Sequence, residues 1–172
     1  MKIIKYTLLS FFAFTLFSCA SVQVKTDYDT QTDFSKYKTF AFYKKGIDQS
    51  KISDLDKRRI LRAIEKELTA KGMTKSSNPD LLVSIFAKAE KQINVYNDPW
   101  YPYYYTPYYR NNVSQYVQGT LFIDLIGADK KQLLWQGVGK GALNTSSKPE
   151  KKEARIQEIV AEILAKYPPT KE

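Results

Sequence analysis

Apolar residues recur at helical spacing in two stretches of the chain. The first stripe occupies positions 60, 61, 64 and 68, after the sequence SDLD at 53–56, which resembles a capping box, and before a glycine stop signal at Gly72. The second occupies 156, 159, 160, 163 and 167. It follows a second capping box, SKPE at 147–150, and ends at Pro168-Pro169. The pattern predicts two amphipathic helices.

Alternating or strongly apolar runs predict five strands. The first strand lies within 20–36, and the other four cover 39–43, 81–96, 115–126 and 133–143. Turns are predicted at 46–51 and 127–130. The last three strands form an antiparallel meander. The order is β-β-α-β-β-β-α, so we expect a single α+β domain with a mostly antiparallel sheet of about five strands and two helices on one face.

The N-terminus is typical of an exported protein. Lys2 and Lys5 precede an apolar run at 6–17, too short to span a bilayer, and the run ends in LFSC, which looks like a bacterial lipobox. Cys19 is the only cysteine of 172 residues, and lipidation accounts for an unpaired thiol in an exported protein. An ordinary cleaved signal is the alternative. We expect a lipoprotein signal peptide at 1–18 and one periplasmic domain at 19–172.

A lipidated Cys19 anchors the protein to a membrane through more than one acyl chain, such as palmitate. The residues after the cysteine, ASVQVKT, lack the acidic cluster that directs some lipoproteins to the cell surface. We therefore expect an outer-membrane protein that faces the periplasm, with surface exposure left open.

Composition restricts the chemistry. The chain has no histidine and a formal charge of +9, which falls to about +7 without the signal peptide. Histidine-based triads and zinc motifs built on His or Cys are excluded, and neither an EF-hand loop nor a phosphate-binding glycine loop occurs. Gly137, Gly139 and Gly141 are typical of small residues on one face of a strand. We expect no enzyme activity, metal or cofactor, and partners such as anionic lipid or cell-wall polymer rather than nucleic acid.

Four cations lie largely off the apolar stripe of the first helix: Arg58, Arg59, Arg62 and Lys66. One interpretation is a solvated helix face. The other is a basic patch facing the phosphates of phospholipid or lipopolysaccharide.

The segment 97–113 has an unusual composition. Its core, DPWYPYYYTPYY at 98–109, contains three prolines, which exclude a regular helix or a central strand. Three hypotheses remain open: a long hairpin loop without a ligand, a surface that stacks on peptidoglycan or lipopolysaccharide sugars, and a contact with another envelope protein or the membrane interface. The candidate contact residues are Trp100, Tyr101, Tyr103, Tyr104, Tyr105, Tyr108 and Tyr109.

Four stretches carry a family resemblance: VKTDYDTQTDFSKYKTFAFY (24–43), LTAKGMTKSSNPDLLVSIF (68–86), GTLFIDLIGADKKQLLWQGVGKGAL (119–143) and IQEIVAEILAKYPP (156–169). In this order they resemble lipoproteins of the "domain of unknown function 4136" family, which is common in Bacteroidetes and other Gram-negative bacteria. The resemblance implies a lipoprotein with one α+β domain, and it carries no catalytic site across because the family has no established catalytic residues. We expect a non-catalytic binding or structural accessory of the envelope. The alternative is an auxiliary subunit of an envelope transport or assembly complex.

Overall fold

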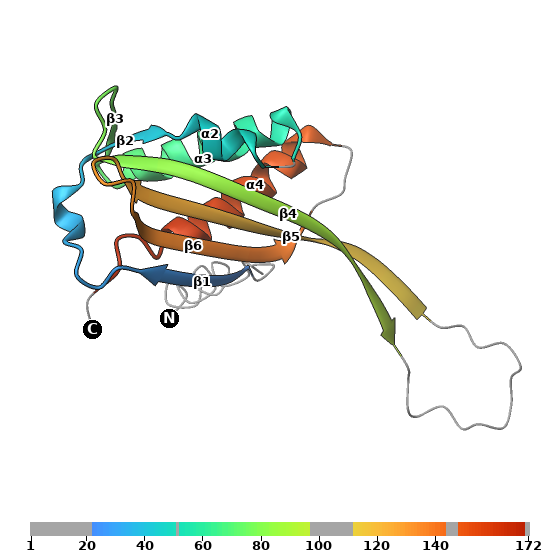
Figure 1. Ribbon diagram of the computed structural model, residues 1–172. Coiled ribbons are helices and arrows are strands. Elements are labelled where there is room, and N and C mark those ends of the chain that lie inside the picture. Colours follow the sequence, from blue (N-terminus) through green and yellow to red (C-terminus); the bar gives the residue numbers. More distant parts are fainter. Residues whose placement is uncertain (1–21, 51, 97–111, 144–147, 171–172) are drawn as a thin grey trace, which may run out of the picture.

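A computed structural model describes residues 22–50, 52–96, 112–143 and 148–170. These residues form an α+β domain built on a six-stranded sheet in the order β1-β6-β5-β4-β2-β3 (Figure 1). The predicted fold class is confirmed, with one more strand and one more helix than expected.

The centre of the sheet is the predicted antiparallel meander of β4 (Leu81–Tyr96), β5 (Asn112–Gly127) and β6 (Leu133–Ala142). β4 and β5 pair along their whole length, with Ile85 opposite Ile123. β6 pairs with β5 only as far out as Gln118, so both central strands continue beyond their neighbours as a two-stranded arm (Figure 1).

The outer strands are paired in two ways. β1 (Gln23–Tyr28) lies antiparallel to β6, with Tyr28 opposite Trp135. β2 (Thr39–Phe42) lies parallel to β4, and the two-residue β3 (Thr74–Lys75) lies parallel to β2. The parallel pairing follows from the connection, because helices separate β2 from β4 along the chain.

The first long helix, α3 (Asp54–Ala70), begins and ends as predicted. Ser53 Oγ accepts a hydrogen bond of 3.1 Å from the N–H of Asp56. Gly72 has a φ of 84°, and the N–H of Met73 donates to the Leu68 carbonyl at 3.0 Å, which is a Schellman ending.

The second long helix, α4 (Pro149–Leu164), begins differently from the prediction. Its N-cap residue is Lys148, which makes no side-chain capping bond, and Pro149 is the first helical residue. The expected serine cap, Ser147, lies outside the described residues. Tyr167 is buried as predicted but lies beyond the helix end.

The turn predicted at 46–51 is wrong in its first half. A short helix, α2 (Lys44–Asp48), replaces it, and a 3-10 turn, η1 (Phe34–Lys36), lies ahead of β2. The helix forms because Ile47 is buried in the core, while Gly46 lies so close to the Ser84 side chain that a Cβ would overlap it. The glycine therefore marks a close approach and not a turn.

The long helices α3 and α4 cover one face of the sheet (Figure 1). The core between them consists largely of aliphatic side chains from alternate strand positions and from both helix stripes, together with Trp135. Gly137 and Gly139 on β6 let α4 approach closely, since a Cβ on either would overlap Ile163. The small residues predicted for one strand face are thus explained by helix packing.

Candidate functional site

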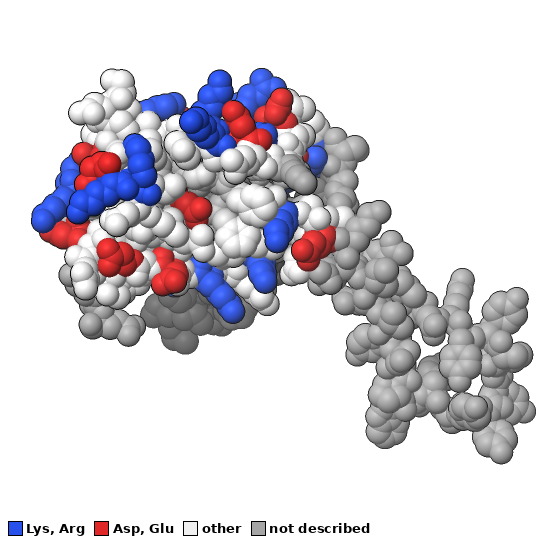
Figure 2. All heavy atoms as spheres, in the orientation of Figure 1, with Lys and Arg blue, Asp and Glu red and all other residues white. Residues whose placement is uncertain are grey.

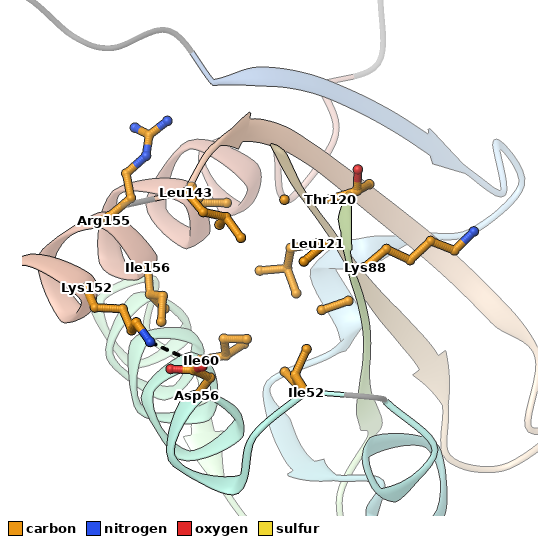
Figure 3. Close-up of a pocket in the computed structure, with 14 residues that line it drawn as sticks. Ile52, Asp56, Ile60, Lys88, Thr120, Leu121, Leu143, Lys152, Arg155 and Ile156 are labelled. Carbon is orange, nitrogen blue, oxygen red and sulfur yellow. Dashed lines mark ion pairs between the residues drawn. The ribbon is translucent and has the colours of Figure 1, made fainter. Parts of the chain in front are cut away.

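A cavity of about 200 Å³ opens between the first halves of α3 and α4 and the sheet beneath them (Figure 3). Its walls are mainly aliphatic and come from both helices, from β4 and β5 and from the segments next to them. The lining residues are Ile52, Asp56, Ile60, Ala87, Lys88, Ala89, Gly119, Thr120, Leu121, Leu143, Lys152, Arg155, Ile156 and Ile159.

The floor of the cavity is hollow because the strands carry small residues there. Ala89 lies opposite Gly119 in the sheet, two pairs further out than Ala87 and Leu121 and therefore on the same face. Deeper in the core the same face carries larger side chains, such as Ile85. A Cβ on Gly119 would lie 2.5 Å from Leu143 Cδ2, so the glycine also makes room for the leucine that closes one side.

An ion pair lies at the edge of the cavity. Lys152 Nζ is 3.9 Å from Asp56 Oδ2, and Figure 3 shows the lysine directed towards this carboxylate. Asp56 has two closer partners. Its Oδ1 lies 2.8 Å from Arg59 Nη1, and its Oδ2 accepts a hydrogen bond of 2.9 Å from Ser53 Oγ. Of the three partners of Asp56, Lys152 is therefore the one that the carboxylate holds most weakly.

The other two lining cations point elsewhere. Arg155 Nε donates to the Ala142 carbonyl at 3.0 Å, and Arg155 Nη1 lies 2.7 Å from Glu158 Oε2. Lys88 Nζ lies 5.7 Å from the centre of the Phe86 ring. Figure 3 shows both charged ends directed away from the cavity, so these residues line it with their stems.

This arrangement is suited to holding an apolar group. A concave, mostly apolar site with few polar groups at its edge is the usual form of a small-molecule site. Within the described ranges, no cluster of three or more Asp, Glu, Cys or His side chains is placed to hold a metal ion.

Two of the predicted sites fall on residues that the structure does not describe. Cys19 lies in 1–21, and the aromatic candidates Trp100, Tyr101, Tyr103, Tyr104, Tyr105, Tyr108 and Tyr109 lie in 97–111. The strands that lead to and from the aromatic segment, β4 and β5, pair up to Tyr96 and Asn112. β5 therefore begins three residues before the predicted strand 115–126 and includes the last two residues of the predicted loop 97–113.

The four predicted basic residues all lie on α3. Arg58, Arg62 and Lys66 are exposed and four residues apart, so they form one ridge of the helix. Arg62 Nη2 lies 3.7 Å from Glu153 Oε1 on α4. Arg59 lies off this ridge and binds Asp56 at the cavity edge. The ridge supplies exposed positive charge, while its binding to phosphates stays a prediction.

The face of the sheet away from the helices is mostly uncharged in its middle, with charged side chains gathered around it (Figure 2). Phe86 and Phe122 lie there with ring centres 5.9 Å apart. Asp124 lies on the same face and accepts a hydrogen bond of 2.8 Å from Gln136 Nε2. Burial raises the pKa of Asp124 above its ordinary value, and this hydrogen bond only partly offsets the effect.

A second hollow, of about 540 Å³, lies near the end of α4. Its aromatic rings pack edge to face on one another, with Phe34 5.9 Å from Tyr167 and Tyr167 5.5 Å from the buried Trp135. Burial raises the pKa of Tyr167 to about 12. These contacts fix the segment after α4 to the sheet, so we assign the aromatic cluster a packing role.

Sequence reasoning did not find the cavity. Its residues come from four separate segments of the chain, and none forms a motif by itself. The signal in the sequence was the change from large to small residues along one strand face, from Ile85 to Ala87 and Ala89.

Among the described residues, no helix is long and apolar enough to span a membrane. A comparison with curated proteins gives no match.

Two solved structures share the fold. A PDZ domain protein from Parabacteroides distasonis is 21% identical with a TM-score of 0.55, over 96% of this chain; the chain spans only 40% of that protein. PelC from Paraburkholderia phytofirmans, solved as a dodecamer, is 10% identical with a TM-score of 0.50. The similarity covers 84% of this chain and 96% of the PelC chain.

The family comparison covers nearly the whole domain. The match extends over residues 24–169, from β1 to the prolines after α4, and includes every element that lines the cavity. The chain therefore belongs to the DUF4136 family, a domain of unknown function.

Proposed function

We propose that this protein is a non-catalytic binding protein of the bacterial envelope, anchored by a lipid on Cys19, and that its ligand binds in the cavity between α3, α4 and the sheet. The cavity is the observation that carries the proposal. Its aliphatic lining includes Ile60, Leu121 and Ile156, and it lies open at the side where Ala89 is exposed. Burial of an apolar group there removes it from water without requiring polar partners.

The volume suggests the size of the bound group. An apolar protein cavity of about 150 Å³ binds benzene, so a cavity of about 200 Å³ offers room for a group of about seven or eight carbon atoms. Burying a methylene contributes about 0.8 kcal/mol. About seven of them supply roughly 5–6 kcal/mol, from which the cost of association must be subtracted. Binding of moderate strength is expected.

The test uses the full chain in a phosphatidylcholine nanodisc, with isoleucine methyl groups labelled for NMR. Decyl maltoside, a neutral single-chain probe, should shift the signals of Ile60, Ile156 and Ile159, which line the cavity, and leave Ile64 unchanged. Ala89→Leu should fill the cavity and weaken the shifts at least tenfold. Ala142→Leu, an exposed position on β6 outside the cavity, is the matched control. Shifts that survive Ala89→Leu, or none in the parent chain, would refute the proposal.

Anchoring is tested separately. The signal-like N-terminus and Cys19 support it. Mass spectrometry of the mature N-terminal peptide should find Cys19 carrying acyl chains, and Cys19→Ala should release the protein from outer-membrane fractions. An unmodified Cys19 in membrane-bound protein would contradict the anchor.

The aromatic segment offers a further contact with the envelope. We keep binding of peptidoglycan glycan through Trp100 and Tyr103–Tyr105 as part of the proposal, because the rings of Trp and Tyr suit stacking on sugar faces. Retention on purified peptidoglycan should fall when these residues are changed to alanine. Equal retention would remove glycan binding from the proposal.

The second candidate is a subunit of an envelope transport or assembly complex. The similarity to PelC, solved as a dodecamer, favours it, as does the mostly uncharged sheet face in Figure 2. Mild cross-linking followed by native mass spectrometry should then capture a defined assembly. A monomer that retains cavity binding would favour the first candidate.

A further inference from the structure

Resting on the proposed function, we infer that the cavity selects a single alkyl chain with an anionic head group, and that Lys152 is the residue that recognises the head group. The lining and the mouth of the cavity each supply part of this inference.

The lining indicates an alkyl chain. The side chains that define the space, such as Ile60, Leu121, Leu143 and Ile156, are aliphatic, and among the residues that the structure describes none that lines the cavity is aromatic. Sugars and planar ring systems are usually held by stacking on aromatic rings, whereas a flexible chain adapts to branched aliphatic walls. The volume of about 200 Å³ admits one short chain and excludes two side by side.

The residues at the mouth of the cavity indicate the sign of the charge on the head group. Asp56 is engaged by Arg59 at 2.8 Å and by Ser53 at 2.9 Å, whereas Lys152 lies 3.9 Å from the same carboxylate, beyond hydrogen-bonding distance. Lys152 can therefore turn to a ligand without leaving Asp56 unpaired. An ammonium that donates to a carboxylate or phosphate makes a short, charge-assisted hydrogen bond.

The surrounding charges support an anion over a cation. The other charged residues among the described lining of the cavity have their own partners or directions: Asp56 pairs with Arg59, Arg155 with Glu158, and Lys88 is directed outwards. A cationic head group would compete with Arg59 for Asp56 and lie beside Lys152. An anionic head group meets Lys152 without displacing either of the shorter ion pairs.

The experiment compares probes that share one alkyl chain. Decanoate, decyl phosphate, decyl maltoside and decyltrimethylammonium are titrated into the full chain in phosphatidylcholine nanodiscs. Binding is read from the Ile60, Ile156 and Ile159 methyl signals. The concentration of free probe is corrected for the amount that partitions into lipid, which is measured with empty nanodiscs. We expect the anionic probes to bind at least tenfold more tightly than the neutral and cationic ones. Comparison of decanoate with decyl phosphate separates a fatty acid from a lysophospholipid as the source.

The variants identify the residue. Lys152→Gln should abolish the preference for anionic probes while decyl maltoside binds as before. Lys140→Gln, an exposed cation on β6 that does not line the cavity, should leave the preference intact. Equal binding of all probes, or a preference that survives Lys152→Gln, would overturn the inference and leave the proposed function standing. Failure of every probe to shift the signals would refute both.

A series of acids tests the single short chain. Affinity should rise about fourfold for each added methylene from hexanoate, and should level off at about eight carbons, because the cavity holds about seven or eight carbon atoms. An affinity that continues to rise by the same factor up to dodecanoate would contradict a cavity of this size.

Discussion

Gly137→Ala should destabilise the domain more than the addition of a single methyl group suggests. The added Cβ would overlap the ring of Trp135, which is fully buried, and Cγ2 of Ile163, which belongs to the stripe of α4 over the sheet. Neither neighbour can move into solvent, so the change forces a displacement of α4 or a strained rotamer. Such overpacking costs about 1–3 kcal/mol.

Alanine regains part of this loss because it is favoured over glycine in a strand by up to about 1 kcal/mol. We expect a net loss of about 1–2 kcal/mol, which lowers the Tm of a domain of this size by about 2–8 °C. Urea unfolding of the full chain, followed by far-UV circular dichroism in one mild detergent, measures the difference.

Gly141→Ala is the matched control on the same strand face. Its Cβ would lie 2.7 Å from Arg155 Nη2, the far end of a long side chain, which can shift more cheaply than a buried ring. We expect a loss below about 1 kcal/mol. Equal losses for the two variants, or a neutral Gly137→Ala, would refute the close packing of α4 on β6.

Three further changes test local features by the same unfolding measurement. Ser53→Ala removes the side-chain cap of α3 and should cost about 1 kcal/mol; no loss would show that the cap contributes nothing. Gly72→Ala places a Cβ at a φ of 84° and should cost about 1–2 kcal/mol, whereas a gain would contradict the left-handed ending of α3. Asp124→Asn should stabilise the domain near neutral pH, because a raised folded pKa means that the ionised carboxylate is penalised there. This gain should disappear as the pH falls through the raised pKa to below the ordinary value of 3.8, and a gain independent of pH would exclude titration of Asp124 as its cause.

The sequence predicted most of the fold because its signals are local. The Ser53 cap, the Gly72 stop and the alternating strands of the meander each depend on residues close together in the chain, and all appear in the structure. The helix α2 was missed because Gly46 and its polar neighbours resemble a turn. Its cause is a tertiary contact, the burial of Ile47 and the approach to Ser84.

The candidate site could not be predicted in the same way. Ala89 and Gly119 become neighbours only through the pairing of β4 with β5, and Lys152 reaches Asp56 only because α3 and α4 lie side by side. Sequence reasoning selected residues of conspicuous composition, the aromatic segment and the basic helix face, whereas a cavity arises from side chains that are small or absent.

The most direct test of the cavity as a binding site is covalent mapping. A decanoic acid that carries a diazirine near its methyl end is added to the full chain in nanodiscs, photolysed, and its adducts are located by mass spectrometry. We predict adducts on the peptides that contain Leu121, Leu143 and Ile156, and their loss in Ala89→Leu but not in Ala142→Leu. Adducts confined to other parts of the chain, or unchanged by Ala89→Leu, would contradict the account.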